Sequence, residues 1–237
     1  MFKPRPSLEE RVARHPLGEF FIQWDNVYRQ DVKELERVIA SARDERTMQR
    51  YLEAHPYLMI QHLGGGHGRF VIPQKRLGAE FVPDFLLCEI DSIGPHWKLV
   101  EIESPRGLRA KKNGEPTAHL QHAINQIQDW RRWLTEHIAY AREGLKLEGI
   151  SGNVPGLVIM GRRGDGADPE RLRQILEQNR IEVHSYDWLL TQFRERFKWK
   201  ELARKVKRPP PSELKFRHFR SRQPRVNAAA AAGGKRS

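Results

Sequence analysis

Three acidic residues stand close together at the ends of two expected strands. Asp84 lies near the start of the expected strand 80–90. Glu101 and Glu103 lie at the end of the expected strand 97–103. Because side chains alternate along a strand, Glu101 and Glu103 point to the same face. Like charges held close together repel one another, and burial strengthens the repulsion. Something in the folded protein should therefore compensate these charges.

A divalent cation would compensate them. Mg²⁺ prefers oxygen ligands and is typically held by one or two carboxylates together with waters and substrate phosphate oxygens. Asp84 and Glu101 could supply the carboxylate pair, and Glu103 could be a second ligand or a base that orients water. A cation in this position could polarise a phosphodiester and lower the pKa of bound water. The alternative is that the carboxylates lie in solvent and pair with cations of the following loop. Those cations are Arg106, Arg109, Lys111 and Lys112.

A long helix is expected from about Thr117 to about Ala141, with one apolar stripe at helical spacing. Beside this stripe run His119, His122 and Gln126, at positions i, i+3 and i+7. If the helix packs behind the carboxylate strand, Gln126 could reach a phosphate or an attacking water. The alternative is a helix face that is half core and half solvent. The apolar stripe consists of Ala123, Ile127, Trp130 and Leu134.

The remaining pattern predicts an α/β fold with a mixed sheet. Helices come first, then three strands, a helix, and an alternation of strand, helix, strand and helix. The crossover from 156–161 to 181–186 should add a parallel pair of strands. We expect a strand or extended arm at 18–24, and helix caps at Asp31, Asp168 and Asp187. The expected helices lie within 31–42, 44–59, 117–141, 168–180 and 187–205, and the expected strands within 69–75, 80–90, 97–103, 156–161 and 181–186.

Composition narrows the class of protein. With 237 residues, 38% hydrophobic and 30% charged, the chain can form one sizeable domain with a polar surface. The single cysteine, Cys88, excludes an internal disulfide and makes a thiolate zinc site implausible. No signal peptide and no long apolar run are visible, so we expect a cytoplasmic protein without a membrane span.

The formal net charge of +12 is unevenly distributed. Residues 204–237 contain 11 of the 42 Lys and Arg residues and one of the 30 acidic residues, which gives this tail a charge of +10 and the rest +2. Its proline and alanine runs predict a disordered, low-complexity segment. A basic tail favours contact with a polyanion such as nucleic acid. The alternative is a solvated tail without a defined partner.

The ordered set of motifs resembles a known family of nucleases. PDF at 83–85, followed by a hairpin and VEIESP at 100–105, is similar to the PD-(D/E)xK nuclease pattern. The full series resembles the Shedu-type nuclease domain of bacterial anti-phage defence over roughly residues 45–195. The resemblance implies a restriction-endonuclease-like fold with an αβββαβ core. The series is RYLEAHPYLM, PQKRLGAEFVPDFLL, LVEIESPRGL, HLQHAINQIQDWRRWL, LVIMGRR and IEVHSYDWLL.

The resemblance implies Mg²⁺-dependent cleavage of DNA, with Mn²⁺ as a possible substitute. Asp84 and Glu101 match the family's metal-binding carboxylates, and Gln126 matches the glutamine of the following helix. Glu103 occupies the position of the motif's lysine. That lysine orients or activates water and stabilises charge on the phosphate. A glutamate cannot supply positive charge, but it can accept a proton or bind a second metal.

Several other residues are candidates for the same site. Lys98 lies on the wrong face of its strand to replace the missing lysine, whereas Lys111 or Lys112 could reach in from the loop. Related nucleases often use an acidic residue of the first helix, a position that Glu53 could fill. Glu80 would share a face with Asp84 unless Pro83 introduces a bulge.

We therefore expect three parts in the chain. Residues 1–44 form an N-terminal extension with a helix, 45–204 the nuclease-like domain and 205–237 the basic tail. The expected function is a metal-dependent DNA endonuclease that acts as a homo-oligomer in anti-phage defence. Its DNA would be contacted by the loop cations Arg106, Arg109, Lys111 and Lys112. The alternative is a catalytically impaired protein with the nuclease fold that acts as a nucleic-acid-binding or regulatory module. A scaffold that never contacts nucleic acid is a third reading.

Overall fold

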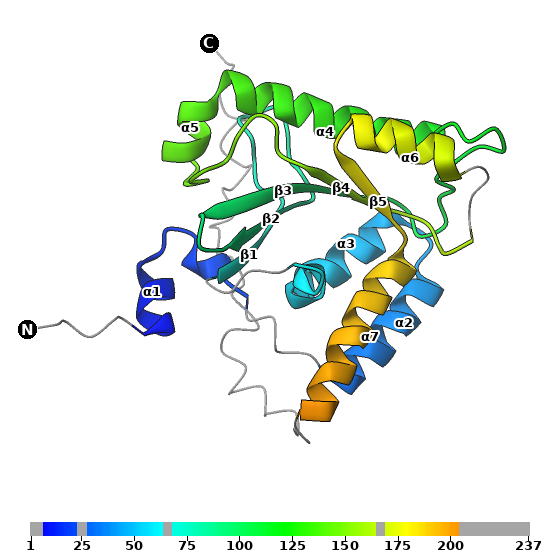
Figure 1. Ribbon diagram of the computed structural model, residues 1–237, viewed down its shortest axis with the longest axis horizontal. Helices are drawn as coiled ribbons and strands as arrows, with labels where there is room; N and C mark the ends of the chain where they lie inside the picture. The colour runs from blue at the N-terminus through cyan, green and yellow to red at the C-terminus, as the bar shows by residue number, and fades with distance from the viewer. Residues whose placement is uncertain (1–6, 23–27, 64–67, 165–168, 204–237) are drawn as a thin grey trace, which may run out of the picture.

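A five-stranded mixed sheet forms the centre of the protein in its computed structural model, which describes residues 7–22, 28–63, 68–164 and 169–203 (Figure 1). Neighbouring strands follow chain order. The first three pair antiparallel, and the third to fifth pair parallel, as the crossover predicts. The strands are β1 (Gly68–Pro73), β2 (Phe85–Ile90), β3 (Pro95–Ile102), β4 (Gly156–Ile159) and β5 (Ile181–His184).

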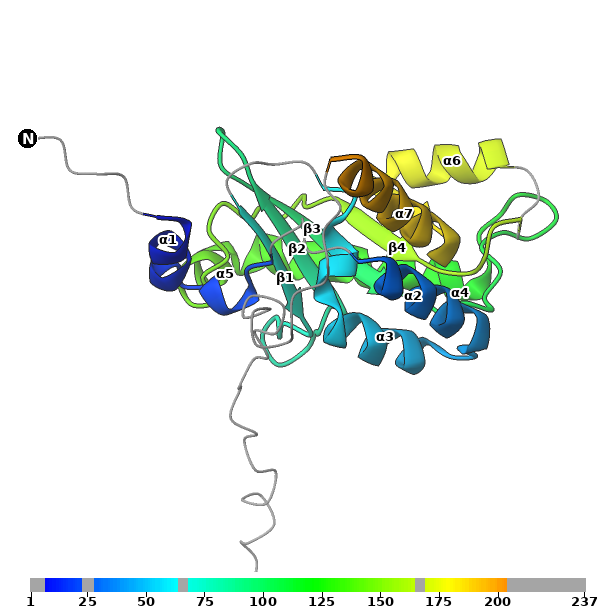
Figure 2. The same ribbon diagram turned by 90° about the horizontal axis from the view of Figure 1, so that it is seen from below.

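Helices cover both faces of the sheet (Figures 1 and 2). One face is covered by α4 and α6, and the other by α2, α3 and α7. No helix within the described ranges is long and apolar enough to cross a membrane. The helices are α1 (Leu8–Arg14), η1 (Gly18–Phe20), α2 (Arg29–Ser41), α3 (Glu45–Ala54), η2 (Pro56–Ile60), α4 (Ala118–Glu136), α5 (Ile138–Glu143), α6 (Pro169–Gln178) and α7 (Tyr186–Ala203).

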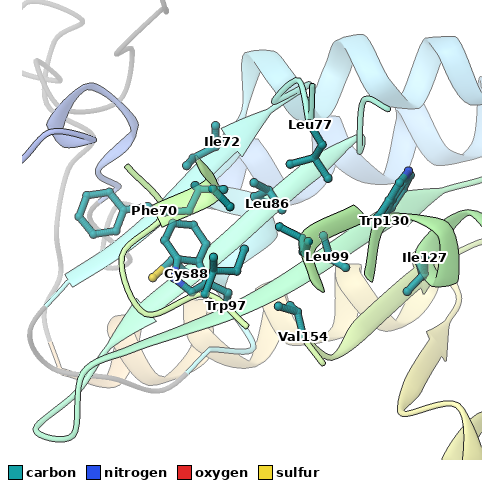
Figure 3. Packing of buried hydrophobic residues seen from close by; sticks show 14 of the residues in the cluster. Phe70, Ile72, Leu77, Leu86, Cys88, Trp97, Leu99, Ile127, Trp130 and Val154 are labelled. Carbon is teal, nitrogen blue, oxygen red and sulfur yellow. The ribbon is translucent and has the colours of Figure 1, made fainter. Parts of the chain in front are cut away.

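The alternation of side chains along the strands divides the core into two clusters. In β3, Leu99 belongs to the cluster under α4, whereas Val100 belongs to the cluster under α2, α3 and α7. Figure 3 shows Ile127 and Trp130 of α4 over the same face of the sheet as Leu99. The apolar stripe predicted for this helix therefore packs behind β3, which carries Glu101 and ends directly before Glu103. The α/β class and the αβββαβ order predicted from the sequence are confirmed.

The N-terminal residues join both clusters. Within the expected arm 18–24, η1 is followed by Phe21, which pairs with Phe70 at the edge of β1, and the amide of Ile22 donates to the carbonyl of Arg69 at 2.9 Å. Phe21 is buried in the cluster under α4, and Leu35 of α2 in the opposite cluster. The sheet is therefore covered partly by residues that precede position 45.

The expected helix 117–141 is two helices. His137 leaves the helical conformation, with φ −119° and ψ 31°, between α4 and α5. Its ring stacks on Trp133 at 4.7 Å, and the Trp133 carbonyl is contacted both by the His137 ring at 3.0 Å and by the His137 amide at 2.9 Å. The break lies at the end of α4 remote from His119, so it leaves the predicted polar line intact.

Two residues predicted to cap helices, Asp31 and Asp187, make other contacts. Asp31 lies in the first turn of α2, where its carboxylate accepts from the amide of Tyr28 at 3.2 Å. Asp187 is held by Arg162 through two hydrogen bonds of 2.9 Å, because a guanidinium binds a carboxylate at two points. The hydroxyl of Ser185 accepts from the Trp188 amide at 3.2 Å instead. The third predicted cap, Asp168, and the basic tail lie outside the described residues.

Candidate active site

The register of β2 and β3 places Asp84 opposite Glu101. Phe85 pairs with Val100, so the next position outward on each strand brings these two acidic residues face to face. Side chains directly opposite in an antiparallel pair have Cβ atoms about 4.5–5.5 Å apart. The Ile102 amide donates to Asp84 Oδ2 at 2.8 Å, which fixes the carboxylate across the end of the pair. The carboxyl groups of Asp84 and Glu101 also share a hydrogen bond.

Burial dominates the electrostatics of this pair. It raises the pKa of Asp84 to about 7, against a smaller lowering by the Ile102 amide. Burial, and then the charge of Asp84, raise the pKa of Glu101 to about 10. Without a cation, the pair therefore retains a proton at neutral pH.

Glu103 lies beside the pair and is only 7% exposed. Its amide donates to the Ile159 carbonyl at 2.9 Å, and its carbonyl accepts from the buried Tyr186 hydroxyl at 2.8 Å. Burial and the charge of Glu45 raise the pKa of Glu103, while His119 and His122 lower it. His119 Nδ1 is 4.0 Å from Glu103 Oε2. The first turn of α4 therefore faces the third carboxylate.

Glu45 is a fourth member of the cluster that the sequence analysis did not find. It is the first residue of α3, and its charge raises the pKa values of Asp84, Glu101 and Glu103. Burial raises the pKa of Glu45 itself. A signal for it exists, because Glu45, Met48 and Leu52 follow the i, i+3, i+7 spacing of the buried helix stripe.

The two other acidic candidates lie outside this cluster. Glu53 accepts from Gln49 Nε2 at 2.7 Å, and the same amide group contacts the Asp84 carbonyl at 3.4 Å. Glu53 thus supports Asp84 only through Gln49. Glu80 is exposed, and its carboxylate accepts from the adjacent Ala79 amide at 3.1 Å. The chain before Phe85 is not a continuous strand, so Glu80 does not share a strand face with Asp84.

Gln126 lies on α4 one turn beyond His122. Its Oε1 atom is buried and has no hydrogen-bond partner among the described residues. A buried acceptor without a partner is costly, so it favours a donor supplied from outside the chain, such as a water. This position agrees with the role expected for Gln126, which stays a prediction.

Asp84 and Glu101 fit a hard divalent cation. They present carboxylate oxygens close enough to share a proton, and a cation that displaces this proton would relieve their repulsion. Within the described ranges, no group of three or more His, Cys, Asp or Glu side chains could hold a metal ion by itself. Two carboxylates completed by water and substrate phosphate are the arrangement typical of Mg²⁺.

Comparison with known proteins identifies the family. Residues 42–190 match the family described as Shedu protein SduA, C-terminal. The chain belongs to this family. The match confirms the resemblance found in the motif series, and it spans all four carboxylates of the cluster.

Other comparisons add little about this Shedu-family chain. No curated protein matches it. The structure described as restriction endonuclease FokI bound to DNA is similar, with 16% identity and a TM-score of 0.44. The alignment covers 93% of this chain and 33% of that one, so the chain spans about a third of that endonuclease.

The loop cations of this Shedu-family chain have different environments. Arg106 donates to the carbonyls of Ala40 at 2.7 Å and Ala42 at 3.2 Å, and so closes the C-terminal end of α2. Arg109 donates to the Arg162 carbonyl at 3.2 Å. Lys111 and Lys112 are exposed, and Lys111 pairs with Glu115 at 3.4 Å. Contact of these four residues with DNA stays a prediction, and Arg106 also has a structural role.

Replacing Arg106 with alanine is expected to lower the free energy of unfolding by about 1–2 kcal/mol, because two carbonyls at the end of α2 lose a charged donor. Urea denaturation measures this change. Lys112→Ala serves as the control, since it removes an exposed cation of the same loop and should leave stability within about 0.5 kcal/mol. Equal stability of Arg106→Ala and the wild type would contradict this role.

Proposed function

We propose that the protein is a metal-dependent endonuclease that hydrolyses phosphodiester bonds of DNA in bacterial anti-phage defence. The observation that carries this proposal is the carboxylate pair of half-buried Asp84 and buried Glu101, opposite each other at the end of two paired strands. Membership of the Shedu family supports the same chemistry. Buried acidic pairs are expensive to maintain, which favours a functional role for this one.

The residues of the cluster would divide the reaction among them. A divalent cation, when bound, supplies charge that polarises the phosphodiester and acidifies water. Asp84 and Glu101 would hold that cation, with the Ile102 amide fixing the Asp84 carboxylate. Glu103 would take the proton of the attacking water, since its raised pKa brings it closer to neutral pH. Gln126 would orient the water or the phosphate.

Cleavage assays test the proposal. Linear and supercoiled DNA would be incubated with the protein in Mg²⁺, Mn²⁺ or a chelator, beside Asp84→Ala. We expect cutting in either metal, and none with chelator or in the variant. Glu80→Ala, which removes an exposed carboxylate outside the cluster, should cut like the wild type. Full activity of a folded Asp84→Ala protein would sink the assignment.

Glu103→Gln is expected to reduce the cleavage rate about 10²- to 10⁴-fold, the usual contribution of a positioned general base. It should also remove the limb of the pH–rate profile that reports deprotonation of Glu103. Single-turnover cleavage at several pH values measures both effects. A variant with the wild-type rate and the wild-type profile would show that Glu103 is not the base.

A catalytically impaired relative is the second candidate. The observation that favours it is Glu103 at the position of the family motif's lysine, which removes a positive charge from the site. Under this alternative, folded protein would bind DNA with an affinity that falls steeply with salt but would not cut it in any metal.

A further inference from the structure

The loop between β3 and α4, residues 104–117, leaves the carboxylate cluster and returns to it. It begins directly after Glu103 and ends two residues before His119, and these two side chains are 4.0 Å apart. We refer to this segment as the β3–α4 loop. Figures 1 and 2 both show it, in green before α4, projecting from the molecule beyond the ends of the neighbouring elements. Anything bound at the cluster would therefore lie next to this loop.

The base of the β3–α4 loop is attached to the body of the protein. Arg106 donates to the carbonyls at the end of α2, and the Ser104 hydroxyl donates to the Arg43 carbonyl at 3.2 Å. Arg43 lies two residues before Glu45, so the loop and the cluster share one support. The Gly107 amide closes a turn on the Ser104 carbonyl at 3.0 Å.

The two arms of the loop are also bonded to each other. The Thr117 hydroxyl donates to the Leu108 carbonyl at 2.6 Å, and its amide donates to the Arg109 carbonyl at 3.1 Å. Further along, the Lys111 amide donates to the Glu115 carbonyl at 2.8 Å. The backbone at Leu108 and Arg109 is therefore held in place by Thr117, the residue that precedes α4.

Leu108 nevertheless exposes 56% of its surface. Single exposed leucines are common on proteins. This one is distinguished by a rigid backbone, by its place five residues after Glu103, and by Arg109, Lys111 and Lys112 in the same loop. Cations that contact phosphates position a protein on DNA, and apolar side chains beside them can enter a base step and unstack it.

We propose that Leu108 contacts the nucleobases beside the scissile phosphate and wedges into that base step. This inference rests on the proposed function for its substrate, duplex DNA. The cations of the β3–α4 loop would hold the phosphates while Leu108 opens the stack. Opening would bend the duplex and bring the scissile phosphate toward Asp84 and Glu101.

Fluorescence of duplexes containing 2-aminopurine at successive positions tests the wedge, because the probe brightens when it is unstacked. Titrations in EDTA keep the DNA intact. The wild type should brighten one position, and Leu108→Ala should lose this signal and bind about tenfold more weakly with an unchanged salt slope, since no charge is removed. Leu108→Met should keep the signal. Ile93→Ala is the matched control, since Ile93 is 87% exposed in the turn at the opposite end of β2 and β3.

The outcomes separate this inference from the proposed function. Wild-type brightening and affinity in Leu108→Ala would overturn the wedge, even if Asp84→Ala abolishes cleavage. Cleavage that persists in Asp84→Ala would overturn the catalytic assignment, while a Leu108-dependent signal would still support the wedge. A change of mass in sedimentation caused by Leu108→Ala, with no change in the DNA signal, would assign Leu108 to a contact between two copies of this chain and overturn the proposal.

Discussion

Glu101→Gln is expected to make the metal-free protein more stable and catalytically inactive. The amide of the new side chain can still donate to Asp84, but it carries no charge to bury. The pKa of Glu101 is about 10 in the folded protein against an ordinary value of 4.5. At pH 7 the carboxyl group stays protonated in the folded protein but would ionise in the unfolded chain. The interval from the ordinary value of 4.5 to pH 7, at about 1.36 kcal/mol per pH unit, corresponds to a gain of about 3 kcal/mol.

The sign of this effect depends on pH. Because the folded-state pKa of Glu101 is raised, its contribution to stability is fully present below about pH 4.5 and is lost as pH rises toward about 10. The stability difference between Glu101→Gln and the wild type should therefore be close to zero at pH 4. It should then grow by about 1.4 kcal/mol per pH unit.

Urea denaturation of both proteins in EDTA, from pH 4 to pH 8, measures this growth. Glu80→Gln is the control, because Glu80 is exposed and outside the cluster. A constant difference between Glu101→Gln and the wild type across this range would mean that Glu101 ionises normally in the folded state. Cleavage by Glu101→Gln at the wild-type rate would remove it from the proposed cation site.

Divalent cations are expected to stabilise the wild type strongly at pH 8 and weakly at pH 5. At pH 8 a cation replaces the proton held by Asp84 and Glu101 and relieves their repulsion. A ligand at 100 times its Kd stabilises the folded state by about 2.7 kcal/mol. For a chain of this size, that corresponds to a rise in Tm of roughly 5–10 °C. At pH 5 both carboxyl groups hold protons more firmly, since the pKa of Asp84 is about 7, so the cation must compete.

Differential scanning calorimetry with increasing Mn²⁺ or Mg²⁺ measures this shift. Asp84→Asn should abolish it at both pH values, because one of the two ligands is gone. Glu53→Gln is a matched control on α3, since Glu53 reaches Asp84 only through Gln49. An equal shift in Asp84→Asn and the wild type would place the cation elsewhere on the protein.

Much of the carboxylate geometry follows from local rules that a sequence reveals. Strand alternation predicts that Glu101 and Glu103 share a face, and Leu99 on the same face of β3 is indeed under α4. The placement of Asp84 directly opposite Glu101 depends on the register of β2 and β3, which the sequence pattern alone does not specify. The expected strand 80–90 begins only at Phe85. The prediction that Glu80 shares a strand face with Asp84 therefore fails, because it assumed one continuous strand.

The contacts that the sequence pattern does not reveal join residues that lie far apart in the chain. Glu45 reaches the cluster because α3 packs against β3, and the search for an acidic residue on this helix led to Glu53 instead. Arg106 resembles a DNA-binding cation in sequence, yet its guanidinium closes α2, more than 60 residues away along the chain. Tyr186 supports Glu103 from the start of α7, and its hydroxyl carries no signal of this contact in the sequence.

The near-coincident ends of the β3–α4 loop have an evolutionary consequence. Doubling the length of a loop costs only about 0.6 kcal/mol of closure entropy, and a segment that starts and finishes at one point can grow without displacing its anchors. Glu103 and His119 would keep their separation while the tip between them gains or loses residues. The loop 104–117 can therefore gain or lose residues at its tip without displacing the carboxylate cluster at its two ends.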